Sequence, residues 1–425
     1  MFGASVTQAQ LNFTGLDSVL SYAERNSTSI KTGEQQSLLA KWTKVTAVAN
    51  TVNFKSPISF SATDNLQLPV NFLPAEAFGG PAGTFRQVTL GQEYVSNFNF
   101  NPQIDIINPY NWAKVKSASV NKEMTEVSNQ ISKKTLFENI AAAYHNIIAL
   151  QEQIILTEKS LSASDSIHQI VKNKFSAGIV REQDLNNALA NQLNIKDKLA
   201  QLKVMHQQQL NTLKILCDIS AGTQITLQNN SAAEFSEGNL KSNSNLNSRY
   251  NNLQNQYAKN ELRANRLSML PVLSAFYYQG WQHNSNIAFF DSKSSWIQNQ
   301  YIGLRITVPF PPDVTKISQS YTSKINYRIT SLNDKHSELQ TELNNRSLEL
   351  DYEKALSSYQ TAKQIFDLKN SNFSKSINQF KEGLLSTDNL LIAFNEMVNS
   401  QLNVVAAFSS AQFVKSKISI SNSLK

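Results

Sequence analysis

The most constraining feature of this sequence is a pair of unusually long alternations of apolar and polar residues. Between Ile58 and Phe72 every second residue is apolar except Asp64, and between Val88 and Ile106 the same period recurs. A period of two is that of a β-strand with two unlike faces. Strands of globular proteins run about five or six residues, whereas a membrane β-strand needs about nine to eleven. The alternations therefore predict strands that expose one face to lipid and the other to water.

Two further strands are expected in the C-terminal half. Residues Ile302 to Phe310 alternate in the same way, and an aromatic stretch from Leu273 to Trp281 follows Pro271. Four strands cannot close a barrel, because the smallest closed barrels have about eight. Unpaired strand edges inside lipid would leave backbone groups without hydrogen bonds. The sequence therefore predicts that several chains share one barrel.

The helices expected between these strands are too long for a compact domain. The stretch from about Tyr110 to Lys174 contains neither Gly nor Pro, and as a helix it would extend about 95 Å at 1.5 Å per residue. A similar helix is expected from about Thr315 to Gln379, and shorter ones before and after each. Only 17% of residues are charged, while Asn, Ser and Gln are abundant. We therefore predict an α+β fold, mostly long helices that pack along neighbours and form a tube with water on both sides.

The chain repeats itself once. The segment Phe175 to Val180 resembles Phe380 to Leu385 at an offset of 205 residues, and each copy connects two helical stretches. Such a long period indicates a duplicated half-protein rather than a solenoid. We expect a first structural repeat over residues 10–221, a connector over 222–247 and a second repeat over 248–425. Residues 1–9 resemble the end of a signal peptide cleaved after Ala9.

The composition, and the spacing of histidine and cysteine, argue against several other classes of protein. The net charge is +7, but the basic residues are scattered, so no nucleic-acid partner is expected. The five histidines lack metal-ligand spacing, and Cys217 is the only cysteine. The sequence contains no run of about 18 apolar residues, so no transmembrane helix is expected. We therefore expect no catalytic residues, no metal and no cofactor, and we do not expect an enzyme.

At several places the sequence resembles the TolC family of bacterial outer-membrane efflux proteins. The opening helix Leu16 to Asn26 is similar, as are Ala142-Ala143-Tyr144 with Ile147 to Leu150 in the first long helix. The segments Lys174 to Leu185 and Phe380 to Leu390 resemble the two helix–turn tips of that family. The order of strands and helices matches over nearly the whole chain. The motifs fall at matching places in both repeats.

This resemblance implies a homotrimer with a twelve-stranded barrel in the outer membrane and a helical tunnel in the periplasm. Each chain would give four strands to the barrel, and outer-membrane lipid would surround it. The tunnel would dock onto a periplasmic adaptor protein and an inner-membrane transporter. The implied function is a passive exit duct of a tripartite efflux or type I secretion system.

The resemblance also assigns roles to residues at the two tips. The positions that would contact the adaptor are Gly178, Ile179, Val180, Gly383, Leu384 and Leu385. The positions that would close the periplasmic end are Gln183, Asp184, Asp388 and Asn389. The second copy has Asn389 where an aspartate is common in the family, and this weakens an acidic ring. From the residues alone, Asp184 is equally well explained as a first-turn acid of a helix, and the glycines as helix C-caps.

A second class of function fits part of the sequence. A periplasmic or secreted coiled-coil scaffold or adaptor protein would also have long polar helices, with a small soluble sheet. The length and the two unlike faces of the strands argue against it. A requirement for detergent distinguishes the two.

Overall fold

The computed structural model describes residues 10–228, 240–310 and 313–424. The predicted signal-peptide remnant, residues 1–9, lies outside the described residues, as does part of the predicted connector. The chain divides into two compact units, which we describe separately. Unit 1 contains residues 1–38, 124–252 and 332–425, and unit 2 contains residues 39–123 and 253–331. The division into sequence repeats at residues 10–221 and 248–425 stays a prediction.

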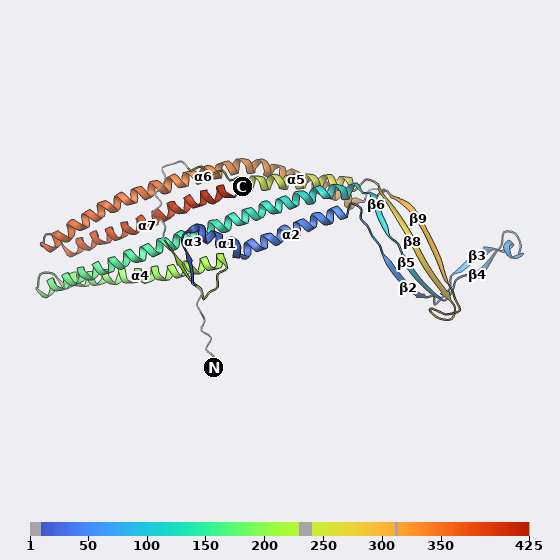
Figure 1. Cartoon of the computed structure of the whole chain (residues 1–425), viewed down its shortest axis with the longest axis horizontal. Coiled ribbons are helices and arrows are strands. Elements are labelled where there is room, and N and C mark those ends of the chain that lie inside the picture. Colours follow the sequence, from blue (N-terminus) through green and yellow to red (C-terminus); the bar gives the residue numbers. More distant parts are fainter. Residues whose placement is uncertain (1–9, 229–239, 311–312, 425) are drawn as a thin grey trace, which may run out of the picture. The chain divides into compact units, whose positions relative to one another are not determined.

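The protein is mostly helical. Its helices are α1 (Leu16–Asn26), α2 (Thr28–Ala49), α3 (Pro109–Ser176), α4 (Glu182–Cys217), α5 (Leu246–Leu267), α6 (Val314–Lys381), α7 (Thr387–Ser423) and the 3-10 helix η1 (Ala75–Phe78). The strands are β1 (Gln10–Phe13), β2 (Ile58–Asp64), β3 (Val70–Pro74), β4 (Phe85–Thr89), β5 (Tyr94–Phe100), β6 (Gln103–Ile107), β7 (Gln224–Leu227), β8 (Val272–Ser285) and β9 (Trp296–Thr307). Figure 1 shows their order along the chain.

The two long helices, α3 and α6, each have 68 residues and confirm the sequence prediction. Helix α3 begins at Pro109, where a missing backbone N–H costs nothing, and it contains no further proline or glycine. At 1.5 Å per residue each helix is about 100 Å long. No helix among the described residues combines the length and apolar character needed to span a membrane.

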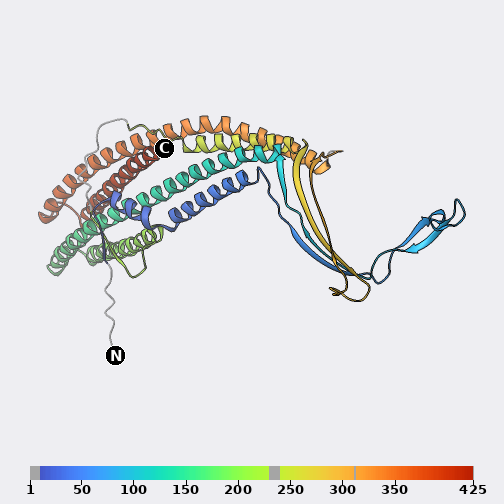
Figure 2. The same ribbon diagram turned by 45° about the vertical axis from the view of Figure 1, so that its right-hand side comes forward.

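Unit 1 is built from two helical hairpins, α3 with α4 and α6 with α7, which lie side by side in both views (Figures 1 and 2). One core lies where α1, α3 and α4 meet β1 and β7. Its fully buried members include Val19, Ile140, Ile147 and Leu213. Residues 140 and 147 are two turns apart on α3, so they share one face. A second core lies at the hairpin ends and is described below.

The strands β1 and β7 form a small parallel sheet that the sequence does not predict. Gln10 pairs with Gln224, and Phe13 pairs with Leu227. Strand β7 lies inside the predicted connector, residues 222–247. Four-residue strands carry too short an alternation to be recognised, and a parallel pair between segments more than 200 residues apart leaves no local signal.

The main sheet of unit 2 contains strands in all four predicted regions, although the first, β2, is shorter than predicted. Strand β8 pairs on one side with β5 and β6, which are successive parts of one strand interrupted at Pro102, and on the other side with β9. Strand β2 pairs with β5, and all neighbours are antiparallel. The sheet is curled, and its strands lie side by side in both views (Figures 1 and 2).

The two faces of this sheet differ as the alternation predicts. Phe60, Phe98 and Trp281 are direct cross-strand neighbours on the apolar face. Further along that face Ile302, Leu304 and Ile306 are 68–81% exposed. On the other face Ser61 lies opposite Asn97, which lies opposite Gln282. The sheet thus leaves a broad apolar surface uncovered in the single chain.

The first predicted strand pair is not continuous. Residues 65–69 and 90–93 interrupt it, so the predicted strand from Ile58 to Phe72 becomes β2 and β3, and β4 and β5 are likewise separate. Pro69 lacks a backbone N–H donor, and Gly91 has a φ of 128°, which is not that of a β-strand. The backbone hydrogen bonds between the two strands are therefore interrupted at these residues. The Asn65 side chain donates to the Gln92 carbonyl across the break at 2.8 Å.

Candidate functional site

The two hairpin tips of unit 1 carry the residues that the sequence analysis assigned to partner contact. At the first tip Gly178 has a φ of 72°, and the Ile179 N–H donates to the Lys174 carbonyl at 2.9 Å. At the second tip Gly383 has a φ of 78°, and the N–H of Leu384 makes the equivalent bond of 2.8 Å. This is the Schellman ending of a helix, in which a left-handed glycine lets the chain reverse. Both tips therefore have the same local geometry.

The apolar residues after each glycine divide into one exposed and one packed position. Ile179 is 68% exposed and Leu384 is 75% exposed. Val180 and Leu385, the next residues, pack against one apolar cluster. Each tip thus presents one aliphatic side chain to solvent and anchors the following one.

That cluster, which we call the tip core, joins both hairpins. Its buried members are Ile167, Val171, Ala188, Ile195, Phe380, Leu390, Leu391, Phe394 and Val398. They come from α3, α4, α6 and α7, so the tip core fixes the two tips relative to each other within unit 1. Removing large buried side chains from such a core typically costs about 2–5 kcal/mol.

A lysine links the ends of the two long helices. The Lys174 ammonium donates to the Phe380 carbonyl at 2.6 Å and lies 4.2 Å from the centroid of the Phe380 ring. Phe380 is 2% exposed, so the contact is largely shielded from water. An ammonium near a helix C-terminus also interacts favourably with the unpaired carbonyls there.

Asp184 serves as a local cap at the start of α4. Its carboxylate accepts the backbone N–H of Arg181 at 2.9 Å, and the Arg181 guanidinium lies 3.6 Å away. Asp184 is 8% exposed, whereas the neighbouring Gln183 is exposed. The first-turn interaction that the sequence allows for Asp184 is therefore present.

The acid of the second tip makes a contact between the hairpins. The Asp388 carboxylate accepts from the Asn187 side-chain amide at 2.9 Å, which joins α4 to α7. The backbone N–H of Asn389 donates to the Ser386 hydroxyl at 3.3 Å, a helix N-cap. Asp388 and Asn389 are exposed. The closing role predicted for these residues and for Gln183 and Asp184 stays a prediction.

The arrangement resembles known proteins in sequence over part of the chain and in fold over nearly all of it. The family model for outer membrane efflux proteins matches residues 72–217, from β3 to the end of α4. The comparison with curated proteins found no match to this sequence. The outer membrane protein VceC from Vibrio cholerae has a TM-score of 0.75 at 15% identity, with 95% of this chain and 94% of that chain covered.

Two other solved structures are similar. The CmeC outer membrane channel of Campylobacter jejuni has a TM-score of 0.71 at 17% identity, covering 96% of this chain and 85% of that one. The open state of the MtrE outer membrane channel of Neisseria gonorrhoeae has a TM-score of 0.72 at 13% identity, covering 99% and 93%. The resemblance to the TolC family is confirmed. The matched family is one of outer membrane proteins, so the predicted location is confirmed at that level.

The match to the family model for outer membrane efflux proteins includes only one tip. Gly178, Gln183 and Asp184 lie within residues 72–217, and Asp388 and Asn389 lie beyond them. The structure nevertheless brings both tips to one tip core. Asn187 and Lys174, which bridge the hairpins, are not identified by the sequence analysis, because neither stands out in a local pattern and each pairs with a residue more than 200 positions away.

The ionisable side chains of the described residues offer no metal site. They contain no group of three or more His, Cys, Asp and Glu side chains that is arranged to hold a metal ion. Burial, with a smaller contribution from Asp218, raises the pKa of the Cys217 thiol to about 12, so the thiolate is not formed near neutral pH. The candidate site of this chain is therefore the pair of tips.

Proposed function

We propose that this chain is one of three identical subunits of an outer-membrane exit duct. The duct passively conducts substrates delivered by a periplasmic adaptor and an inner-membrane transporter, as part of an efflux or type I secretion system, and no catalysis is involved. The observation that carries this proposal is that the sheet of unit 2 has two open edges with apolar flanks. Among the described residues β2 pairs only with β5 and β9 only with β8.

The directions of the two edge strands suit closure by other copies. Neighbouring strands of the sheet are antiparallel throughout, so β2 and β9, the two ends of a four-strand order, run in opposite directions. The β9 edge of one copy would therefore meet the β2 edge of the next as another antiparallel pair. A head-to-tail contact of this kind forms a ring when the rotation from copy to copy closes on the first copy. Each predicted repeat would then supply two strands.

Exposed apolar helix stripes continue both edges. Helix α2 leads into β2 and carries Leu39 and Trp42, 70% and 65% exposed. Helix α6 follows β9 and carries Tyr321 and Ile325, 65% and 55% exposed. These residues recur at three- and four-residue spacing, as in helix–helix seams. They support a contact between subunits that runs from sheet to helices.

The test of the assembly is the native mass of the protein extracted from isolated outer membranes. Three chains of 47.5 kDa give about 140 kDa of protein, and recovery is expected only with detergent. Conductance across a planar bilayer then tests whether that species is a channel. A soluble species or a monomer in detergent would overturn the shared barrel and favour the coiled-coil scaffold.

The tips provide the test of partner contact. Ile179→Asp combined with Leu384→Asp places a charge at each exposed aliphatic position, and we expect export to fall at least tenfold while trimer recovery stays unchanged. Leu193→Asp is the matched control, because Leu193 is 54% exposed on α4 outside the tips. Loss of co-purification with the adaptor should accompany loss of export. Normal export by the double variant would exclude the tips as the contact.

A further inference from the structure

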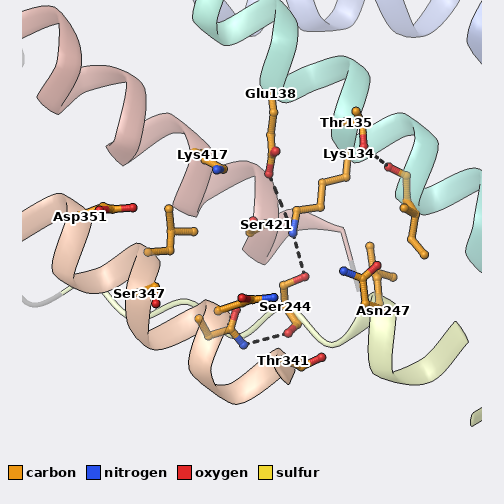
Figure 3. A pocket seen from close by; sticks show the side chains of 15 residues that line it. Lys134, Thr135, Glu138, Ser244, Asn247, Thr341, Ser347, Asp351, Lys417 and Ser421 are labelled. Carbon is orange, nitrogen blue, oxygen red and sulfur yellow. Dashed lines mark hydrogen bonds and ion pairs between the residues drawn. The ribbon is translucent and has the colours of Figure 1, made fainter. Parts of the chain in front are cut away.

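A polar cavity of about 390 Å³ lies inside unit 1, away from the tips. Its walls come from α3, α6, α7 and the segment leading into α5, with Lys134, Ser244 and Lys417 from three different parts of the chain (Figure 3). Neither the tip contacts nor the open sheet edges use these residues.

The segment in front of the cavity, residues 241–245, is fixed by hydrogen bonds. The Asn345 amide donates to the Ser244 carbonyl at 2.9 Å, and the Ser242 hydroxyl donates to the Asn345 side-chain oxygen at 2.8 Å. The Asn422 amide of α7 donates to the Lys241 carbonyl at 2.8 Å. The cavity therefore has a preformed wall rather than a mobile one, which reduces the ordering cost of binding.

Two ammonium groups line the cavity, and few carboxylates lie close enough to balance their positive charge. Lys134 donates to the Ser244 hydroxyl at 3.1 Å, and its carboxylate neighbour, Glu138, is 3.9 Å away (Figure 3). Within the described chain Lys417 has no carboxylate within 4 Å. Burial lowers the pKa of Lys134 despite Glu138, and the positive charge of Lys417 lowers it further. A second anion in the cavity would relieve this repulsion.

A buried hydroxyl completes the set of donors. Ser421 of α7 is 1% exposed, lines the cavity, and its Oγ has no hydrogen-bond partner in the described structure. A buried polar group without a partner costs about 1–3 kcal/mol. Because this Oγ is closed to solvent, a ligand oxygen reaches it only when the Ser421 side chain turns toward the cavity, and the hydrogen bond then formed would remove this cost.

We propose that this cavity binds a small oxyanion of the phosphate type, held by Lys134, Lys417 and Ser421. Ammonium groups and a hydroxyl are the donors that such an anion accepts from. Glu138 and Asp351 also line the cavity, and their carboxylates disfavour a second anionic group on the same ligand. A bound oxyanion would join α3 to α7 behind the fixed segment and stabilise unit 1.

The test is phosphate-dependent thermal unfolding of the full-length protein in detergent. Sodium phosphate replaces sodium chloride at constant ionic strength and pH, and helical circular dichroism reports the midpoint. We expect phosphate to raise the midpoint of the native protein. Lys417→Met and Ser421→Ala should each weaken the apparent phosphate affinity about tenfold or more. Neither side chain has a partner to lose, so both variants should fold.

Two further variants separate a built site from general charge effects. Lys415→Met removes the same charge from the same helix outside the cavity, and it should leave the phosphate response unchanged. Glu138→Gln removes the competing carboxylate and should strengthen the response, a gain that misfolding cannot imitate. No difference between phosphate and chloride for the native protein, or an equal loss in Lys415→Met and Lys417→Met, would overturn the proposal.

Discussion

At the residue scale, the two tip glycines hold a backbone conformation that other residues rarely adopt. A Cβ at Gly178 or Gly383 would meet no atom within 4 Å, so space is not what requires glycine there. Glycine is required by the positive φ, because the left-handed region raises the conformational free energy of residues with a Cβ by about 1–2 kcal/mol. The sequence identifies both positions correctly because the glycines interrupt long stretches without glycine.

Replacing either glycine by alanine should therefore destabilise its hairpin. For Gly178→Ala and Gly383→Ala we expect a loss of about 1 kcal/mol each, seen as a lower midpoint of thermal unfolding. Gly222→Ala is the control, because a Cβ there also meets no atom within 4 Å and its φ lies outside the left-handed region. Equal effects at all three positions would contradict the role of the backbone conformation.

His145 makes the stability of unit 1 depend on pH. Burial lowers its pKa from about 6.5 to about 4, and its ring contacts the Ser416 hydroxyl at 2.9 Å. The unfolded chain binds a proton that the folded chain does not, between those two pH values. Stability from this group is therefore complete above about pH 6.5, falls as the pH drops toward 4, and the loss reaches roughly 3 kcal/mol.

The check is the pH profile of the unfolding free energy of the native protein and of His145→Gln. Glutamine retains a polar group near Ser416 but does not titrate. We expect a flatter profile for the variant between pH 4 and 6.5. Parallel profiles would assign the pH dependence to other groups.

At the element scale, the decisive contact is a buried carboxylate where the sheet meets the helices of unit 2. Asp105 of β6 is 4% exposed and accepts from Asn53 at 2.7 Å, Asn108 at 2.9 Å and Ser274 at 2.7 Å. These donors come from the α2–β2 connection, the β6–α3 connection and β8. Asn53 also has a φ of 40°. One side chain thus orients the connections at one end of the sheet.

Asp105→Ala should be strongly destabilising. It leaves three donors, two of them buried, without an acceptor, and we expect a cost of at least about 3 kcal/mol or failure to assemble. Asp64→Ala makes the same chemical change at an exposed position of β2 and should have little effect. The measurement is the yield of folded protein in outer membranes and its thermal midpoint. Similar yields for both variants would show that the Asp105 network is dispensable.

At the scale of the whole molecule, the single chain leaves apolar surface exposed on its sheet and on two of its helices. The exposed apolar row of β9 suits lipid, whereas the stripes on α2 and α6 lie in helices that the proposal places outside the bilayer. Specific oligomers bury such surfaces at their interfaces. Assembly should therefore be sensitive to charge on these stripes.

Ile325→Glu places a carboxylate on the α6 stripe and should abolish the species of about 140 kDa while leaving helical content unchanged. The neighbouring Lys324→Glu is a larger change in charge on an exposed residue outside the stripe, and it should assemble normally. Native mass in detergent measures both. Normal assembly of Ile325→Glu would remove this stripe from the interface.

Local periodicity predicted most elements of the fold because their signals are repeated many times. Residues 110–174, without glycine or proline, predicted α3, and the alternation of Ile302, Leu304 and Ile306 predicted β9. The interruption near Pro69 and Gly91 was missed, since an alternation can continue through a break in hydrogen bonding. The alternation indicates on which face of the sheet a residue lies, but not which residue of the neighbouring strand it pairs with.

By itself, the sequence determined the classes of element and the two glycine tips, because these follow from period, length and backbone sterics. Only the tertiary structure decided which distant residues meet. The contacts of Lys174 with Phe380 and of Asn187 with Asp388, and the place of Ser421 in the wall of a polar cavity, depend on how helices far apart in the chain are placed. Hydrogen bonds and charges act over a few ångströms, so their partners are set by packing and not by neighbours along the chain.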